Sequence, residues 1–208
     1  MCYTPRLIVE VVYMSRLVRG IGVKGNKYFS SVDNKPVKEY RLWESMLDRC
    51  TEKHWSTHPT YTGTTCSENF KSYTFFYEWC QEQIGFGNID SNNRYWHLDK
   101  DLLVKGNKLY SEDTCVFIPA KLNNLILKGD KRRGDYSIGV FYRADRGKFM
   151  CSCDPKGYIG LFATEYDAFL AYKKYKESFI KAVAIEYKQQ LDARAYKSLI
   201  DYSVEFDD

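Results

Sequence analysis

The sequence lacks a long apolar run and a recognisable export signal. Its apolar stretch at residues 7–12 is interrupted by Glu10 and falls well short of the roughly 18 consecutive apolar residues that a membrane span requires. No small-residue cleavage site follows this stretch, so a secretion signal is not expected. We therefore expect a protein that does not span a membrane and that stays in the cytoplasm.

Paired metal-ligand motifs and cofactor motifs are also missing. The seven cysteines are an odd count, and no two of them are separated by the two-residue gap typical of zinc knuckles. We interpret them as reduced, mostly buried thiols. A zinc site that gathers Cys50, Cys66 and Cys115 with a histidine stays open, but the spacing does not favour zinc. Without a phosphate loop or a dinucleotide fingerprint, no small-molecule cofactor is expected.

What the chain does contain is apolar and aromatic surface. Of the 208 residues, 44% are hydrophobic and 34 are aromatic (12 Phe, 4 Trp and 18 Tyr), which predicts a globular protein with a sizeable core. The net charge of +4 is the sum of +8 over residues 1–200 and −4 over the tail 201–208. Residues 121–148 hold eight basic and three acidic side chains. We expect a basic patch there, for which the acidic tail competes.

Hydrophobic periodicity predicts an α+β fold. The expected helices cover residues 38–50, 70–80 with Ser72 as a cap, 122–127, and a long stretch after Thr164 that breaks near Asp192. The expected strands cover residues 7–13, 95–103, 115–118, 136–142, 148–153 and 158–162. Residues 51–69 are expected to form a loop, in which the neighbouring histidines His54 and His58 are not expected to bind metal. The long helix is expected to bury Ala168, Tyr172, Tyr175, Phe179 and Ala182 on one face.

These elements suggest four segments. Residues 1–36 form an N-terminal strand and loop, 37–127 a first module, 128–188 a second module that begins with a glycine-bounded basic linker, and 189–208 a helical extension with the acidic tail.

The second module carries a family pattern. It contains four short motifs in this order: Ile138-Gly139-Val140, Gly147-Lys148-Phe149, residues 160–164 (GLFAT) and residues 167–172 (DAFLAY). In the order of these motifs, the module resembles the DNA-binding domain of the plant ethylene-response factors, the APETALA-type domain. The resemblance implies a three-stranded antiparallel sheet laid in the DNA major groove, with one helix packed behind it.

The plant domain's base-reading side chains are largely replaced in this sequence. Where that family carries arginines and a tryptophan, this chain has Phe141, Tyr142, Arg143 and Arg146. The expected contacts to double-stranded DNA in the hairpin are therefore Tyr142, Arg143, Arg146 and Lys148. In the basic linker they are Lys128, Lys131, Arg132 and Arg133. A solvated hairpin with no DNA role is the alternative.

Residues 96–119 of the first module resemble the core of the HNH-type homing endonucleases of bacteriophages. Residues 40–79 resemble the helical lead-in of those proteins. The resemblance implies a ββα module with one metal ion beside one general base. This sequence keeps Asp99 and Asn107, but Lys100 occupies the position of the base histidine and Thr114 that of the last asparagine. The module is therefore a degenerate version of the family pattern.

A nuclease of this kind needs an oxygen ligand for its cation and a neutral imidazole that accepts a proton from water. His97, Asp99 and Asp101 alternate along the expected strand, which places them on one face. On this hypothesis Asp99, Asn107 and Asp101 hold Mg²⁺ or Mn²⁺, His97 is the base, and Lys100 neutralises the phosphate. The alternative is that these polar groups form the solvated side of the strand.

Two functions follow from this sequence. The first is a phage-type protein that binds double-stranded DNA and nicks or cleaves it in a metal-dependent reaction. The second is a non-catalytic module that binds DNA or a host protein, for example as a regulator or as an inhibitor of a host defence system.

Overall fold

The computed structural model describes residues 17–126 and 134–206. It is a mixed helical and sheet structure that divides into two compact units, Met1–Glu78 and Trp79–Asp208. This division falls inside residues 37–127, for which the sequence predicted one module. The expected strand at 7–13 and four basic linker residues, Lys128, Lys131, Arg132 and Arg133, lie outside the described residues.

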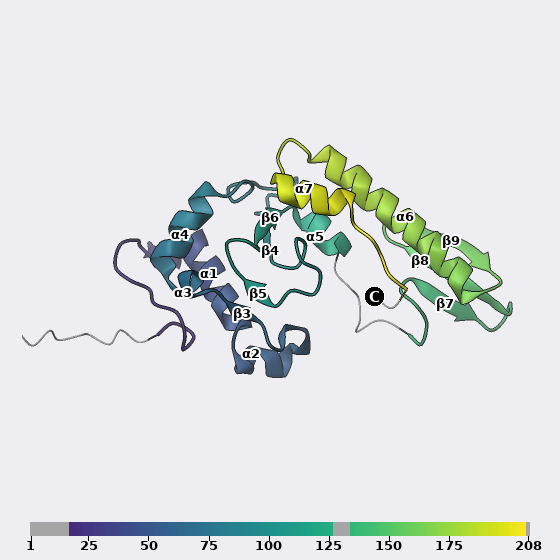
Figure 1. Ribbon diagram of the computed structural model, residues 1–208, viewed down its shortest axis with the longest axis horizontal. Helices are drawn as coiled ribbons and strands as arrows, with labels where there is room; N and C mark the ends of the chain where they lie inside the picture. Colours follow the sequence, from purple (N-terminus) through teal and green to yellow (C-terminus); the bar gives the residue numbers. More distant parts are fainter. Residues whose placement is uncertain (1–16, 127–133, 207–208) are drawn as a thin grey trace, which may run out of the picture. The chain divides into compact units, whose positions relative to one another are not determined.

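The first unit consists of short helices and very short strands (Figure 1). Its helices are α1 (Lys38–Arg49), α2 (Glu52–Thr57), the 3-10 helix η1 (Pro59–Tyr61), α3 (Glu68–Lys71) and α4 (Tyr73–Glu82), which continues into the second unit. Its strands are β1 (Ser31–Val32), β2 (Lys35–Pro36) and β3 (Thr65–Cys66). β1 and β2 pair antiparallel around Asp33 and Asn34, both at positive φ, as a tight hairpin turn requires.

The core of the first unit lies between α1 and the segment that contains α3 and α4. Trp43, Met46 and Leu47 of α1 are fully buried, which confirms the three- and four-residue spacing that predicted this helix. The Trp43 indole Nε1 donates a hydrogen bond of 2.8 Å to the carbonyl oxygen of Phe70. An apolar helix face and one satisfied indole therefore hold these elements together.

The expectation that residues 51–69 form a loop is wrong. Thr51 caps α2, because its Oγ1 accepts the His54 backbone N–H at 3.3 Å, and Glu52 places a negative charge in the first turn. Ser67 caps α3 in the same way at 3.2 Å from the Phe70 nitrogen. These short helices have no apolar stripe, so periodicity did not reveal them.

In the described part of the second unit there are two sheets and three further helices (Figure 1). The strands are β4 (His97–Asp99), β5 (Leu109–Tyr110), β6 (Val116–Ile118), β7 (Val140–Arg143), β8 (Lys148–Cys153) and β9 (Gly157–Phe162). The helices are α5 (Ala120–Ile126), α6 (Glu165–Glu186) and α7 (Ala193–Ile200). β4 pairs antiparallel with β6, and α5 packs against β4.

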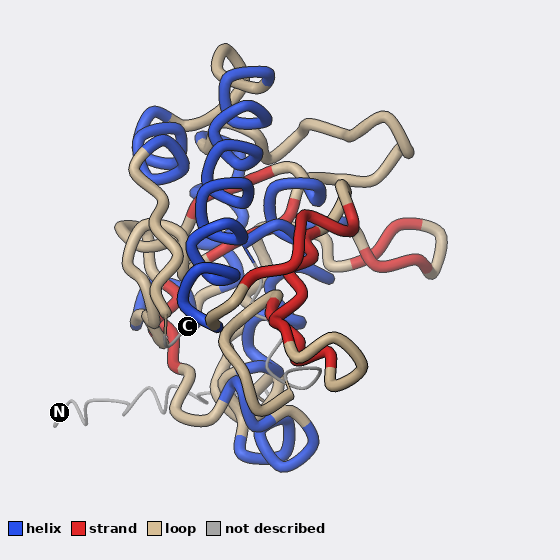
Figure 2. Tube along the Cα trace, turned by 90° about the vertical axis from the view of Figure 1, so that its right-hand side faces the viewer, coloured by secondary structure: helices blue, strands red, loops and turns tan. Residues whose placement is uncertain are grey.

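The strands β7, β8 and β9 form the expected three-stranded antiparallel sheet, with the long helix α6 beside it (Figure 2). Val140 pairs with Cys151, and both are buried against Ala168 and Tyr172 of α6. Gly139 precedes this strand at φ +75°, and a Cβ on it would lie 2.1 Å from the Tyr172 ring. Only glycine fits this close approach of the sheet to the helix.

The helix α6 begins as predicted. Thr164 Oγ1 accepts the Asp167 backbone N–H at 3.1 Å, and Asp192 caps α7 after the expected break. The predicted face is correct for Ala168 and Tyr172 but wrong for Ala182, which is exposed. The reason is that the second half of α6 packs against α5 and α7, where it buries Ile180, Val183 and Ala184.

The acidic tail packs on α6. Val204 is 3% exposed within the core that α6 and the sheet share, and its backbone N–H donates to Glu177 Oε1 at 2.9 Å. Phe206 packs edge-on against Phe169, with ring centroids 5.0 Å apart. Val204 thus anchors the tail in this core, whereas Phe206 packs on its edge and stays 44% exposed. Within the described residues, no helix has the length and apolar character to cross a membrane.

Candidate functional site

The predicted catalytic histidine lies on β4, opposite Ile118 of β6. His97 is exposed, and its Nδ1 lies 3.1 Å from the Asn123 amide nitrogen of α5. Because an amide nitrogen only donates, His97 Nδ1 is the acceptor in this contact. Asn123 was not among the residues predicted from sequence; the signal was a polar pair, Asn123-Asn124, inside a short helix after the strand.

Asp99 ends the strand β4. Its Oδ1 accepts backbone N–H groups from Asp101 at 2.8 Å and Leu102 at 2.7 Å, which turns the chain away from β6. The expected strand 95–103 is therefore wrong beyond Asp99, and Asp101 does not continue the face of His97. Desolvation raises the pKa of Asp99, although the two backbone hydrogen bonds oppose the rise.

Lys100 is the buried centre of the following loop, with 6% of its surface exposed. Its ammonium forms an ion pair with Asp101, donates to the Asn107 carbonyl oxygen at 2.8 Å and lies 5.6 Å from the centre of the Tyr110 ring. In this arrangement the charge is neutralised inside the protein. The predicted role of Lys100 at a phosphate does not fit that placement.

The side chain of Asn107 is also hydrogen-bonded within the loop. Its Nδ2 donates to the carbonyl oxygens of Lys100 at 2.8 Å and Leu109 at 2.6 Å, and its Oδ1 accepts the Leu109 N–H at 3.1 Å. Thr114 closes the same loop by donating to the Leu109 carbonyl oxygen at 2.7 Å. The amide therefore closes a turn, and its oxygen is not presented to a cation.

These contacts test the metal site that the HNH resemblance implies. Asp99 Oδ1 and the Asn107 amide bind the backbone, and Asp101 pairs with Lys100. In the described part of the chain, no group of three or more His, Cys, Asp or Glu side chains is arranged to hold a metal ion. As folded, the predicted ligands Asp99, Asp101 and Asn107 do not fit a Mg²⁺ or Mn²⁺ centre.

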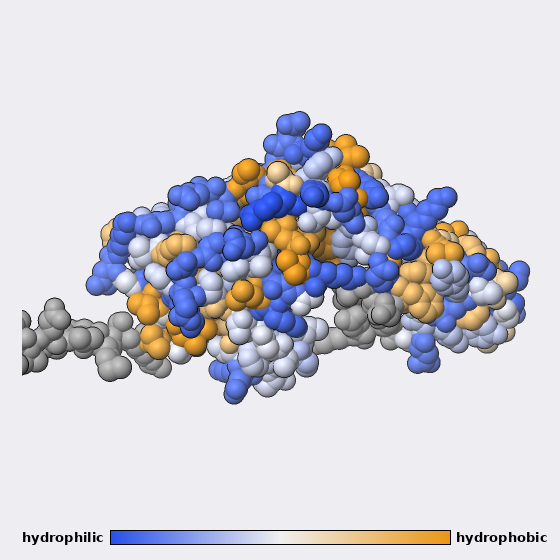
Figure 3. All heavy atoms as spheres, in the orientation of Figure 1, coloured by the Kyte–Doolittle hydropathy of each residue, from blue (hydrophilic) through white to orange (hydrophobic). Residues whose placement is uncertain are grey.

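The second candidate surface is the face of the β7–β9 sheet that points away from α6, which we call the outer face. Cross-strand pairing places Phe141 beside Met150, and Met150 beside Leu161. Phe141 is 44% exposed, and Tyr158, also on this face, is 58% exposed. In Figure 3, apolar residues lie among hydrophilic ones over this end of the chain. The outer face is thus aromatic and apolar at its centre.

Basic side chains occupy one end of the outer face. Arg143 pairs across the strands with Lys148, and both are exposed. In the connecting turn, Asp145 accepts two hydrogen bonds from Arg143, at 2.9 and 3.0 Å, and lies 3.7 Å from Arg146. The contact with Arg143 lowers the pKa of Asp145. The hairpin keeps a net charge of +2 over residues 143–148.

Tyr142 points to the helix side of the sheet. Its ring packs against Phe149, with centroids 5.1 Å apart, and against Tyr136 at 6.2 Å. It is still 45% exposed at the sheet edge. Of the four predicted hairpin contacts, the structure therefore brings Arg143, Arg146 and Lys148 together, with Tyr142 on the opposite side.

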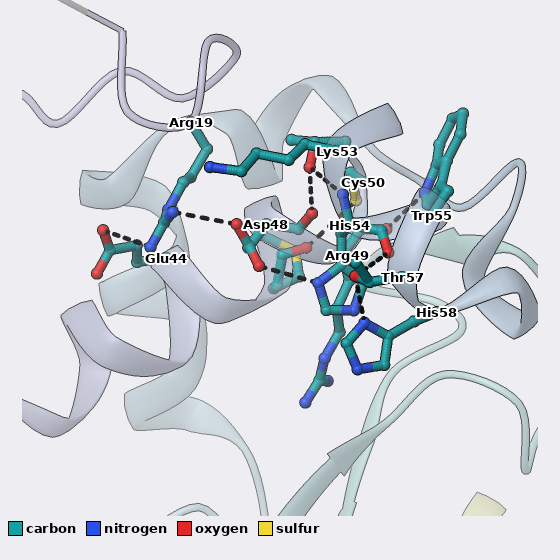
Figure 4. Close-up of polar contacts among 12 residues, drawn as sticks. Arg19, Glu44, Asp48, Arg49, Cys50, Lys53, His54, Trp55, Thr57 and His58 are labelled. Carbon is teal, nitrogen blue, oxygen red and sulfur yellow. Dashed lines mark hydrogen bonds and ion pairs between the residues drawn. The ribbon is translucent and has the colours of Figure 1, made fainter.

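A polar cluster in the first unit was not predicted (Figure 4). Asp48 accepts from Arg19 at 3.1 Å and lies 3.0 Å from His54 Nδ1. The rings of His54 and His58 stack with centroids 4.4 Å apart. The two histidines were expected in a loop, whereas α2 brings their rings together.

Comparison with known proteins finds no relative. No family model matches the chain, and neither a curated protein nor a solved structure matches it.

Proposed function

We propose that this protein binds double-stranded DNA through the outer face of its β7–β9 sheet. The observation that carries the proposal is the sheet itself: α6 backs one face, while the other presents Arg143 and Lys148 at one end and exposed Phe141 and Tyr158 along it. A twisted antiparallel ribbon fits the major groove and presents alternate side chains to it. This is the binding mode that the APETALA-type resemblance implies.

The basic hairpin supplies the attraction to phosphate. Arg143 and Arg146 share the single carboxylate of Asp145 in an exposed position. Exposed ion pairs of this kind contribute little to stability, because water screens both charges, so a phosphate group can replace the carboxylate at small cost. Lys148 adds a further exposed charge beside Arg143.

The apolar centre of the outer face sets the base preference. Phe141, Met150 and Leu161 stand where bidentate readout of guanine would require arginine. Apolar side chains in the major groove recognise the thymine C5-methyl group. Sites rich in A·T pairs are therefore the proposed target.

We further propose that the β4–β6–α5 region is a scaffold and not a catalytic centre. The order of two paired strands and a helix supports the HNH-like resemblance. The side chains of Asp99, Lys100 and Asn107, however, are hydrogen-bonded to backbone groups of the protein itself. This favours the non-catalytic function of the two that the sequence left open.

The test is incubation of the purified protein with supercoiled plasmid and with a short duplex, in Mg²⁺, in Mn²⁺ and in chelator. The proposal expects a mobility shift in all three conditions and no nicking. Binding should weaken steeply with salt, because each neutralised phosphate releases counterions. Nicking that requires the cation and is lost in Asp99→Ala would overturn the scaffold assignment.

A different result would point to a protein partner. If no duplex binds at low salt, the DNA proposal is wrong, and a host protein becomes the partner that the outer face serves.

A further inference from the structure

The C-terminal tail is held on α6 by two charged side chains that bind its main chain. The Val204 N–H donates to Glu177 Oε1 at 2.9 Å, and the Val204 carbonyl oxygen accepts from Lys173 Nζ at 2.5 Å. Lys173 and Glu177, which we call the clamp, lie one helical turn apart and form an ion pair of 2.9 Å. In an extended chain the N–H and C=O of one residue point to the same side, so the clamp binds Val204 as a neighbouring strand would.

Selectivity comes from the side chains of the tail. Val204 is buried in the core that α6 shares with the sheet, and Phe206 packs edge-on against Phe169. The residues on either side of Val204 are exposed. Alternate side chains of the tail therefore contact the protein, as they do when an extended peptide is bound through its backbone. The site fits a β-branched apolar residue that is followed, two positions later, by an aromatic one.

An open basic cavity continues this site along α6. It has a volume of about 320 Å³ and is lined by six side chains of the helix: the two clamp residues, Leu170, Lys174, Ser178 and Lys181. Three lysines and one glutamate give the lining a net charge of +2. Lys174 and Lys181 are exposed. The cavity therefore favours an acidic chain over a neutral or basic one.

The direction of the tail indicates which ligand would fill the cavity. Phe206 lies near the start of α6 and Val204 lies at the clamp, so the residues before Val204 head toward the second half of the helix, where Lys181 lies. In the intact chain this path is cut short, because Tyr202 turns to α5, where its OH donates to a carbonyl oxygen at 3.5 Å. A peptide that is not attached to α7 can continue along α6 to Lys181.

We propose that this face of α6 is the recognition site for an extended acidic segment of a partner protein, and that the tail is its intramolecular competitor. The tail has the character of the proposed ligand, since residues 201–208 carry four acidic and no basic side chains. Of the described tail residues 201–206, only Val204 is buried, so a segment that adds contacts with Lys174 and Lys181 displaces the tail. The site is independent of DNA binding, which is assigned to the outer face of the sheet.

The experiment uses the full-length protein and a fluorescent synthetic peptide with the sequence of residues 201–208, and it measures anisotropy without DNA. The attached tail competes at a high effective concentration, so the parent protein should bind the peptide weakly. Val204→Gly removes the anchoring side chain of the tail and should bind the same peptide roughly tenfold more tightly. Lys173→Ala in that background should lose the gain. Two aspartates added before the first residue of the peptide should tighten binding further.

The matched pair of variants for the cavity is Lys181→Glu and Lys197→Glu, each in the Val204→Gly background. Lys197 is exposed on α7 and is not among the residues that line the cavity, so only Lys181→Glu should abolish the benefit of the added aspartates. Phe206→Ser should give a smaller gain than Val204→Gly and replaces it if circular dichroism shows that Val204→Gly unfolds.

Three results would overturn the proposal. The first is equal binding of a scrambled peptide, which would reduce the site to a charged surface. The second is the absence of a gain in both released variants, Val204→Gly and Phe206→Ser. The third is a concentration-dependent dimer of the parent protein that Val204→Gly abolishes, which would assign the site to the tail of a second copy.

Discussion

The loop after β4 and the β7–β8 hairpin are both short, charged segments of the second unit, and they use their charges in opposite ways. In the loop, Lys100 is 6% exposed, and Asn107 makes three hydrogen bonds to the backbone. In the hairpin, Arg143, Arg146 and Lys148 are exposed, and the arginines have one carboxylate between them. The loop's polar groups hold the fold, whereas those of the hairpin are available to a ligand.

This difference teaches that residue type does not distinguish a binding group from a structural one. Both segments were assigned to function from sequence, on the same kinds of side chain. What separates them is burial. Lys100 is paired inside the protein, whereas the pair of Arg143 and Asp145 is exposed to water, and a buried polar group that loses its partner costs far more than an exposed one. Substitutions in the two segments should therefore affect different properties.

The largest expected effect is a loss of stability in the loop. Asn107→Ala removes three hydrogen bonds that close the loop, one to the carbonyl oxygen of Lys100 and two to the exposed backbone of Leu109, so we expect the free energy of unfolding of the second unit to fall by about 2 kcal/mol. Urea unfolding followed by circular dichroism measures it. The control Val104→Ala lies in the same loop, where this side chain is 52% exposed; an equal loss of stability in both variants would show that the contacts of Asn107 do not hold the loop.

The next effect is on DNA affinity. The double variant Arg143→Ala/Lys148→Ala should bind a short duplex roughly tenfold more weakly, and the slope of log affinity against log salt should fall by about 2. Fluorescence anisotropy across a salt series measures both quantities. Lys174→Ala removes an exposed charge from α6 and should leave the slope unchanged. Equal losses of DNA affinity in the double variant and in Lys174→Ala would show that the hairpin charges contribute no more than any other exposed charge.

A smaller effect concerns Asp99 and pH. Its pKa is raised in the folded state, so the folded protein favours the protonated carboxyl and the charge costs stability at neutral pH. Asp99→Asn keeps the acceptor for the Asp101 and Leu102 N–H groups without the charge. We expect a modest gain in urea midpoint at pH 7, smaller than the loss in Asn107→Ala, that disappears as the pH falls through the folded-state pKa. A loss at pH 7 would show that the carboxylate charge is needed.

The smallest effect concerns the methyl groups of thymine. Replacing thymine with uracil in an A·T-rich duplex removes only the C5-methyl groups, and each contacted methyl should be worth roughly a threefold change in affinity. Phe141→Ser, with its side chain at the centre of the outer face, should reduce the difference between the two duplexes. Equal binding of thymine and uracil duplexes by the parent protein would refute the base preference and leave the DNA proposal itself intact.

The sequence predicted elements whose signal is local. Strict alternation placed β8 at Lys148–Cys153, and Thr164 and Asp192 marked the starts of α6 and α7. The strand expected at 95–103 was too long, because a side-chain contact of Asp99 ends it, and α2 was missed because its six residues carry no apolar stripe. Where a single side chain ends a strand or caps a helix, the pattern of apolar residues gives little indication of that boundary.

The candidate site was predictable only in part. The family pattern pointed to Asp99, Lys100 and Asn107, and alternation along the strand pointed to His97; the structure brings the first three into one loop. The Asn107 amide faces the backbone because of the path that the loop takes. The spacing of the motif residues in the sequence does not predict that path. Asn123 lies 26 residues from His97 and meets it only because α5 packs on β4.

The length of α6 has a mechanical consequence. Its 22 residues rise about 33 Å, and its two halves pack against different partners, the sheet at one end and α5 with α7 at the other. Because α6 lies on the side of the sheet away from the outer face, it would not touch a duplex bound there. It instead links the sheet to the β4–β6–α5 region, so a proline that breaks the middle of the helix should let these two parts of the second unit move independently.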